Sequence, residues 1–174
     1  SPTNIGMYLL SVVAARDFGW VGTLDAVDRI EATLRTVVEL EHHRGHLYNW
    51  YDVRDGHPLE PRYVSSVDSG NLAGALLTLA NACREMIEQV APGPPALSGI
   101  ADAALLLQEV ARDTGNDRSA AVAERRRLQG ALDVVLAVIA QPPGTPAEWA
   151  ERLTELDAAA RTVSNCAQDV GDKE

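Results

Sequence analysis

The chain has 174 residues, 46% of them hydrophobic and 23% charged, which is enough for a folded domain with its own core. Its formal net charge of −10 argues against nucleic acid or an anionic membrane surface as partner, because phosphates are bound by clustered Lys and Arg. The short basic run at residues 125–127 is interpreted as a solvated helix face, and no apolar run is long enough for direct membrane insertion.

Apolar residues recur at helical spacing in the first half of the chain. A first helix is predicted over about residues 4–17, and Thr23 is the predicted N-cap of a second helix that Gly45 ends. A third helix is predicted to start near Asn71 and to reach about Val90. The intervening segment is expected to be a loop, briefly extended in "RYVSSVD".

Three further helices are predicted in the second half, where prolines interrupt the helical pattern. Ser98 is expected to cap the fourth, over about residues 99–113, and the fifth covers about residues 120–140. Thr145 and Glu148 form a capping box that starts the sixth. The sequence therefore predicts an all-α fold of about six helices in consecutive antiparallel hairpins. Cys83 and Cys166 each lie within a helical pattern and are predicted to be buried, reduced thiols.

The segment "GHLYNWYDVRDGHPLEPRYVSSVDSGN", residues 45–71, is unusually rich for a connector, with four of the eight aromatic residues of the chain. Aromatic faces can stack on a sugar ring, while carboxylates and amides hydrogen-bond to its hydroxyls, so this composition favours a carbohydrate site. The alternative is structural: Trp50 fills the core, and Asp68 or Ser69 caps the third helix.

Two further kinds of chemistry concern this segment and the residues just before it. Glycoside cleavage needs two carboxyl groups, and Asp52 and Asp68 are the candidates, although their separation does not follow from the sequence. His42 and His46 are four residues apart, but Gly45 is expected to end the helix before His46 completes a metal-binding face. Neither a metal nor a cofactor is expected.

The segments "SPTNIGMYLLSVVAARDFGWVG", "GHLYNWYD" and "PLEPRYVSSVDSGNLAGALLTLANAC" occur in this order within residues 1–90. Together they resemble the start of the glucanotransferase (cyclisation) region of bacterial cyclic β-1,2-glucan synthases. The resemblance implies half of an (α/α)6 barrel that acts on β-1,2-glucan, with catalytic acids located elsewhere in the parent enzyme. The substrate-binding residues that it implies are Tyr48, Asn49, Trp50, Tyr51, Asp52, Asp68, Ser69 and Asn71, joined by Asp17 and Trp20.

The resulting expectation is a single helical fragment, residues 1–174, of a larger catalytic domain: residues 1–90 carry the motifs and residues 91–174 are helical scaffold. It is expected to be inactive alone and to lie on the cytoplasmic side of a bacterial inner-membrane protein. Exposed apolar helix faces predict homo-oligomers or association with the remainder of the parent enzyme. Two alternatives stay open, namely a non-catalytic protein-interaction module and a small self-sufficient glycoside hydrolase.

Overall fold

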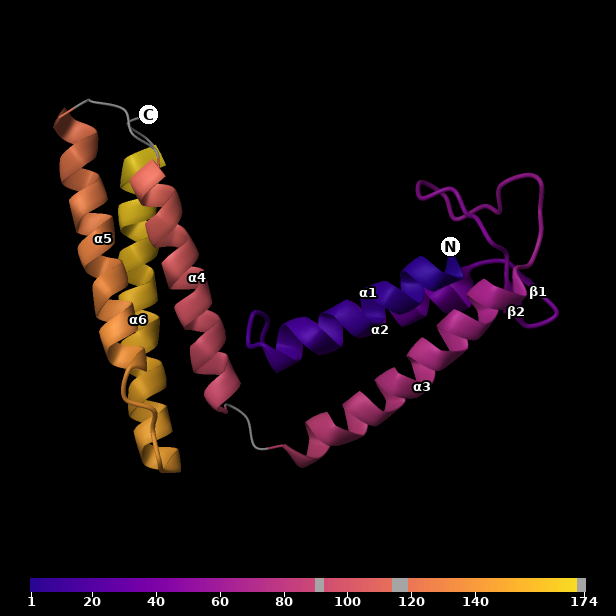
Figure 1. Ribbon diagram of the computed structural model, residues 1–174, viewed down its shortest axis with the longest axis horizontal. Coiled ribbons are helices and arrows are strands. Elements are labelled where there is room, and N and C mark those ends of the chain that lie inside the picture. Colours follow the sequence, from indigo (N-terminus) through magenta and orange to yellow (C-terminus); the bar gives the residue numbers. More distant parts are fainter. Residues whose placement is uncertain (90–92, 114–118, 172–174) are drawn as a thin grey trace. The chain divides into compact units, whose positions relative to one another are not determined.

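The computed structural model describes residues 1–89, 93–113 and 119–171 (Figure 1). Helices dominate these residues, and the only strands among them are two of two residues each, which confirms the predicted all-α class. The chain divides into two compact units, Ser1–Ala91 (unit 1) and Pro92–Glu174 (unit 2).

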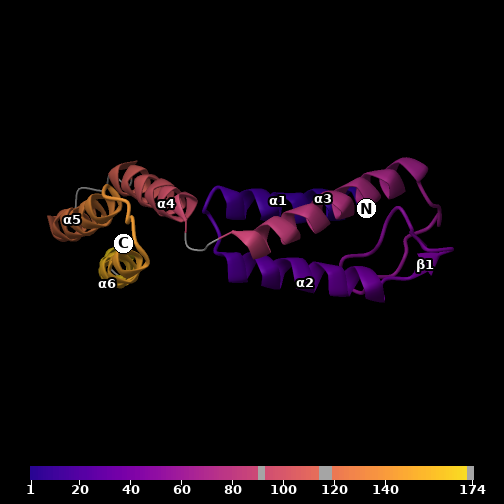
Figure 2. The ribbon, with the colours of Figure 1, turned by 90° about the horizontal axis from the view of Figure 1, so that it is seen from below.

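Unit 1 contains α1 (Pro2–Asp17), α2 (Thr23–Glu39) and α3 (Ser66–Glu88). Helix α1 packs against both of the others, and the segment between α2 and α3 lies at the end of the unit where α1 begins (Figure 2). The apolar stripes of these helices meet in a core of buried residues: Leu9, Val12, Ala26, Ile30 and Leu79.

Helices α1 and α3 run parallel and in close contact. At their N-terminal ends Thr3 Oγ1 donates to Asp68 Oδ1 (2.7 Å), and at their C-terminal ends Arg16 Nη1 donates to Gln89 Oε1 (2.7 Å). Between these contacts the helices approach so closely at Gly6 that an added Cβ would lie 2.9 Å from that of Ala75. A glycine is therefore required there by space, not by its backbone angles.

Helix α2 ends at Glu39, and not at Gly45 as predicted. The chain then forms a hairpin in which β1 (His42–His43) pairs with β2 (His46–Leu47). Both residues between the strands have positive φ angles, 52° at Arg44 and 83° at Gly45, as a type I′ turn requires. The histidines at 42 and 46 consequently lie on a hairpin and share no helix face.

Helix α3 begins at Ser66, five residues before the predicted start at Asn71. Its N-cap is Ser65, whose hydroxyl accepts a hydrogen bond from the Asp68 amide (3.2 Å), so neither Asp68 nor Ser69 is the cap. The start of α2 differs by one residue, since Gly22 and not Thr23 is its N-cap. Because α3 begins at Ser66, Asp68 and Ser69 lie in its first turn.

Unit 2 contains α4 (Pro94–Asp113), α5 (Ser119–Ile139) and α6 (Pro146–Gly171), with α5 packed against the other two. Helix α4 starts at Pro94, before the predicted cap Ser98, because prolines are tolerated in the first turn. The core consists of small and aliphatic side chains: Leu97, Ala104, Leu128, Ala131, Leu132, Val135, Leu156, Ala159 and Val163.

The predicted capping box of α6 is confirmed. The Glu148 amide donates to Thr145 Oγ1 (3.3 Å), and Glu148 Oε2 accepts from the Thr145 amide (3.0 Å).

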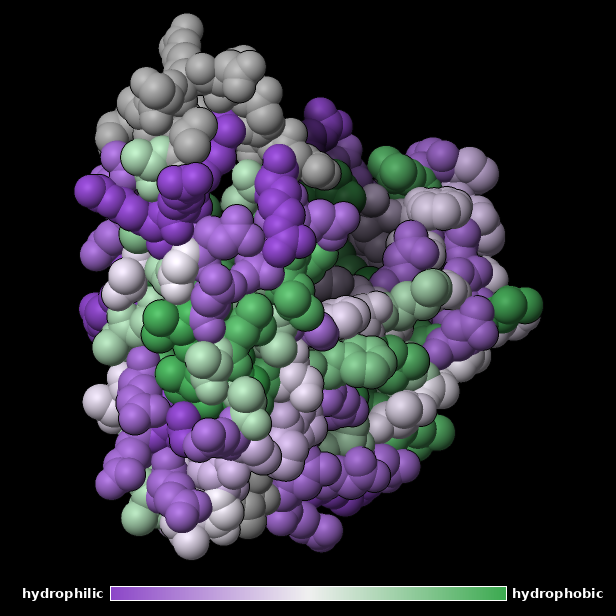
Figure 3. Space-filling model, turned by 60° about the vertical axis from the view of Figure 1, so that its left-hand side comes forward, coloured by the Kyte–Doolittle hydropathy of each residue, from purple (hydrophilic) through white to green (hydrophobic). Residues whose placement is uncertain are grey.

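Apolar side chains also remain at the surface, for instance Leu106 at 63% exposure. Figure 3 shows such apolar patches in green among hydrophilic residues.

The packing order differs from three consecutive hairpins. Helices α1 and α2, α4 and α5, and α5 and α6 pack as neighbours in the chain, whereas α3 packs on α1. The half-barrel arrangement of the six helices stays a prediction.

Candidate functional site

The segment between β2 and α3 folds back on itself at one end of unit 1. Backbone hydrogen bonds join its two halves: the Asn49 amide donates to the Tyr63 carbonyl (2.9 Å), and the Leu59 amide donates to the Trp50 carbonyl (2.9 Å). Closer to the tip, the Asp52 amide donates to the His57 carbonyl (2.8 Å). These hydrogen bonds hold the aromatic residues of this segment in defined places.

Asn49 is the buried centre of the segment, with 6% exposure. In the amide orientation that satisfies all its neighbours, Nδ2 donates to Asp68 Oδ2 (2.9 Å), and Oδ1 accepts from Trp50 Nε1 (2.9 Å) and the Tyr63 hydroxyl (2.7 Å). One carboxamide thus joins both halves of the loop to the first turn of α3.

Asp68 links that loop to α1. Its Oδ1 accepts from Thr3 Oγ1 (2.7 Å), and Thr3 Oγ1 in turn accepts from Asn71 Nδ2 (3.1 Å). Hydrogen bonding with the Ser65 side chain, and then with Thr3, lowers the pKa of the Asp68 carboxyl below its ordinary value. Asp68 is therefore ionised at neutral pH and serves as an acceptor for both elements.

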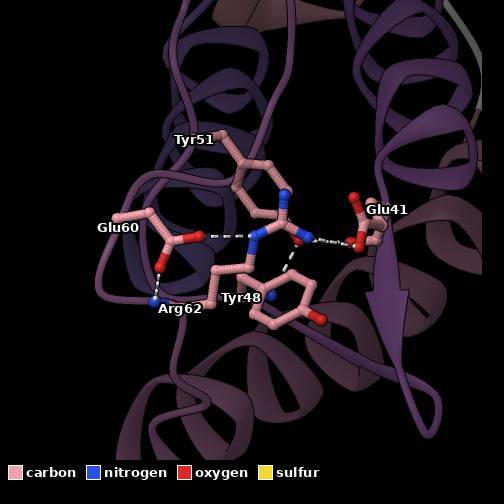
Figure 4. Close-up of polar contacts among 5 residues, drawn as sticks. All are labelled: Glu41, Tyr48, Tyr51, Glu60 and Arg62. Carbon is pink, nitrogen blue, oxygen red and sulfur yellow. Dashed lines mark hydrogen bonds and ion pairs between the residues drawn. The ribbon is translucent and has the colours of Figure 1, made fainter.

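A second polar cluster surrounds Arg62 (Figure 4). Its guanidinium pairs with Glu41 (2.9 Å) and Glu60 (3.1 Å), and lies 5.9 Å from the ring centroid of Tyr48. The Tyr51 hydroxyl donates to the Glu41 carbonyl (2.6 Å) and accepts from the Tyr48 amide (2.7 Å). Burial raises the pKa of the Tyr51 phenol. The cluster ties the loop to the segment that follows α2.

Asp52 stabilises the tip of the loop. Its Oδ1 accepts from the Arg54 amide (2.9 Å), and its Oδ2 pairs with Arg54 Nη2 (2.6 Å). The Arg54 side chain, followed by its backbone amide, lowers the pKa of the Asp52 carboxyl. A general acid at neutral pH needs a raised pKa, so the lowered values at Asp52 and Asp68 disfavour that role for both.

Two aromatic rings of the loop face solvent. Trp50 is 50% exposed and Tyr63 is 46% exposed, whereas Tyr48 and Tyr51 are partly buried. The alternative in which Trp50 fills the core is therefore wrong. Because the indole N–H is already paired within the loop, the surface that Trp50 exposes to solvent is mainly apolar.

The remaining predicted site residues do not all lie at this end of the unit. Ser69 is partly buried, and its Oγ has no hydrogen-bond partner among the described residues. Asp17 and Trp20 lie at the opposite end of α1, where Asp17 pairs with Arg16 (3.0 Å) and Trp20 packs on Phe18 with centroids 5.0 Å apart. The 16 residues of α1 span roughly 24 Å, so the structure does not bring these two residues together with the loop.

Several residues of this site were missed by reasoning from the sequence. Contacts with predicted site residues are made by Tyr63, Arg62, Glu41 and Thr3. Tyr63 and Arg62 lie within "PLEPRYVSSVDSGN" and could have been found as the second half of an aromatic loop. Thr3 is 65 positions from its partner Asp68, and no local pattern indicates that contact.

The structure supplies no metal-binding cluster within its described residues, in which no group of three or more His, Cys, Asp or Glu could hold an ion. Both cysteines are free and partly buried. In the same described residues, no helix is long and apolar enough to cross a membrane.

Comparison with known proteins gives one decisive match. The chain is 48% identical over 132 residues to the cyclic beta-(1,2)-glucan synthase NdvB of Rhizobium meliloti (strain 1021). The aligned residues make up 74% of this chain. This chain is related to that synthase. It spans only 5% of the length of the synthase, and no family model matches it.

The match is longer than the stretch of residues on which the expected resemblance was based. The matched 74% of the chain is longer than unit 1, which ends at Ala91. The relationship to the synthase therefore reaches into unit 2, beyond the residues 1–90 on which the resemblance was based.

Proposed function

We propose that the loop-bearing end of unit 1 binds a β-1,2-linked glucan chain as part of a transglycosylation (cyclisation) domain. The observation that supports this most is the pair of half-exposed rings, Trp50 and Tyr63, whose polar edges are satisfied inside the loop. Aromatic faces of this kind suit the C–H faces of pyranose rings, and the relative's name identifies the polymer.

In this proposal the chain supplies binding and not chemistry. Glycosyl transfer needs a proton donor and a second carboxyl group, while Asp52 and Asp68 are held ionised by their structural hydrogen bonds. The catalytic acids would come from the remainder of a larger bacterial inner-membrane enzyme, with this region on its cytoplasmic side. The chain alone would then be inactive.

The test is a titration of linear β-1,2-gluco-oligosaccharides, followed through the indole N–H signals of Trp20, Trp50 and Trp149. We expect shifts at Trp50, none at Trp149 and unchanged sugars. Trp50→Ala should weaken binding about tenfold or more, which corresponds to about 1.4 kcal/mol. Trp20→Ala is the matched control, because Trp20 is also exposed (60%) but lies at the other end of α1.

Other outcomes would contradict the proposal in distinct ways. New sugar products would support the small glycoside hydrolase instead. An unchanged Trp50 signal at all sugar concentrations, with a folded protein, would leave the protein-interaction module as the better account.

A further inference from the structure

The polar edges of the two exposed rings meet at one point. Trp50 Nε1 lies 2.9 Å from Asn49 Oδ1, the Tyr63 hydroxyl lies 2.7 Å from the same oxygen, and Nε1 and the hydroxyl oxygen are 3.2 Å apart. The indole and the phenol are therefore adjacent at their hydrogen-bonding edges. What each ring leaves to solvent is predominantly its apolar surface.

The side chain at position 49 needs a donor and an acceptor at once. Its Nδ2 must donate to the Asp68 carboxylate, and its oxygen must accept from two ring donors. A carboxamide offers the donor and the acceptor on two separate atoms, whereas Asp would place a second negative charge beside Asp68. Ala would remove one hydrogen bond from each of three polar groups. At 6% exposure, water has little access to replace the lost hydrogen bonds.

Resting on the proposed function, we propose that Trp50 and Tyr63 together form a two-ring stacking platform for neighbouring sugar units of a neutral glucan. Tyr63 is a further ligand-contacting residue. Asn49 is the positioning residue that sets the orientation of both rings, and Asp68 anchors Asn49 to α3. Rings held in place before binding lose less side-chain entropy when the ligand arrives, so the anchor raises affinity without touching the sugar.

The ring contribution is tested with two substitutions at one position. Tyr63→Ala removes the ring and should weaken binding of a linear β-1,2-gluco-oligosaccharide about tenfold. Tyr63→Phe keeps the ring and removes only the hydroxyl, and should weaken binding about twofold. Trp20→Ala, the matched control at the far end of α1, should leave the affinity unchanged.

The positioning role is tested with a double-mutant cycle. Asn49→Ala should weaken binding about fivefold in the chain that retains Trp50 and Tyr63, and should have no further effect when both are alanine. In the free protein, Asn49→Ala should also move the Trp50 indole N–H signal and leave those of Trp20 and Trp149 in place. If the Asn49→Ala variant does not fold, the same measurements are made on Asp68→Asn. This substitution keeps the volume of the Asp68 side chain and replaces one of its two acceptor oxygens.

The outcomes separate this inference from the proposed function. If Trp50→Ala leaves the affinity unchanged, the proposed function fails and the platform with it. If Trp50→Ala weakens binding but Tyr63→Ala does not, the platform is overturned while the glucan site stands. A loss from Asn49→Ala that persists without the two rings would overturn the positioning role.

Discussion

Units 1 and 2 are both built from three helices, but different interactions hold their parts together. The buried core residues described in unit 2 are all Ala, Leu and Val, and Gln108 on α4 donates to Asp133 on α5 (2.8 Å). Unit 1 has a smaller buried core and a long loop, which hydrogen bonds to Asn49 and Asp68 connect to the helices. An apolar core tolerates exchanges between apolar side chains of similar volume, whereas a buried polar network is disrupted by the loss of any one member.

The largest expected effect is on the apolar core of unit 2. Leu132 is 1% exposed, and Leu132→Ala should lower the free energy of unfolding by about 2–5 kcal/mol, because it leaves a cavity. Urea denaturation, followed by the signal of Trp149, which packs on this core, measures the loss. Leu106→Ala is the control: at 63% exposure it should change stability by no more than about 0.5 kcal/mol.

The close contact of α1 and α3 in unit 1 gives the second prediction. Gly6→Ala should cost about 1–3 kcal/mol, since its Cβ would lie 2.9 Å from the Ala75 Cβ and the helices would have to separate. Gly74→Ala is the matched change on α3, where nothing lies within 4 Å, and should instead stabilise the unit by about 0.5–1 kcal/mol. A loss at both positions would contradict the packing described for α1 and α3.

The two helix caps compare the units directly. Ser65→Ala and Thr145→Ala should each cost about 1 kcal/mol of stability in thermal unfolding. Ser65→Ala should also shift the Trp50 indole signal, because Ser65 caps the helix that carries Asp68. Thr145→Ala should shift that of Trp149, whose amide donates to the Thr145 carbonyl (3.0 Å). Equal shifts of both tryptophans in both variants would show that the caps act globally.

The smallest expected effect is the dependence of stability on acid. Asp52 and Asp68 have lowered folded-state pKa values, so their stabilisation is complete above the ordinary carboxyl pKa of about 4 and is lost as the pH falls below it. The urea midpoint should therefore decrease with acid from about pH 5 downward. Asp68→Asn should make that decrease less steep. An identical slope in the variant would mean that Asp68 does not contribute.

The elements that the sequence predicted well are those specified by neighbours along the chain. The capping box at Thr145 and Glu148 is a local rule, and the apolar stripe of α6 fits the core of unit 2. The start of α3 was missed because "SSVDSGN" contains several residues able to cap a helix, and the choice of Ser65 is made by geometry. The end of α2 was missed because an Arg–Gly pair is a weak signal for a type I′ turn.

The residue types of the candidate site could be predicted from the sequence, but the contacts between those residues could not. Trp50, Asn49 and Asp68 stand out as carbohydrate-binding residue types, and the structure places Asn49 within hydrogen-bonding distance of both Trp50 and Asp68. The exclusion of Asp17 and Trp20 from that group depends on which end of α1 meets the loop. The contact of Thr3 with Asp68 determines that end, and it joins residues 65 positions apart.

The Asn49–Asp68 hydrogen bond also has a consequence for how this region can diverge among relatives. A single exchange of Asn49 for Asp would set two carboxylates against each other at 2.9 Å, and a single exchange of Asp68 for Asn would leave Thr3 and Asn49 competing for one acceptor. A reciprocal exchange would keep one negative charge and one amide donor between the two positions. Positions 49 and 68 are therefore expected to covary among homologous sequences, and a lineage that changes one would be under selection to change the other.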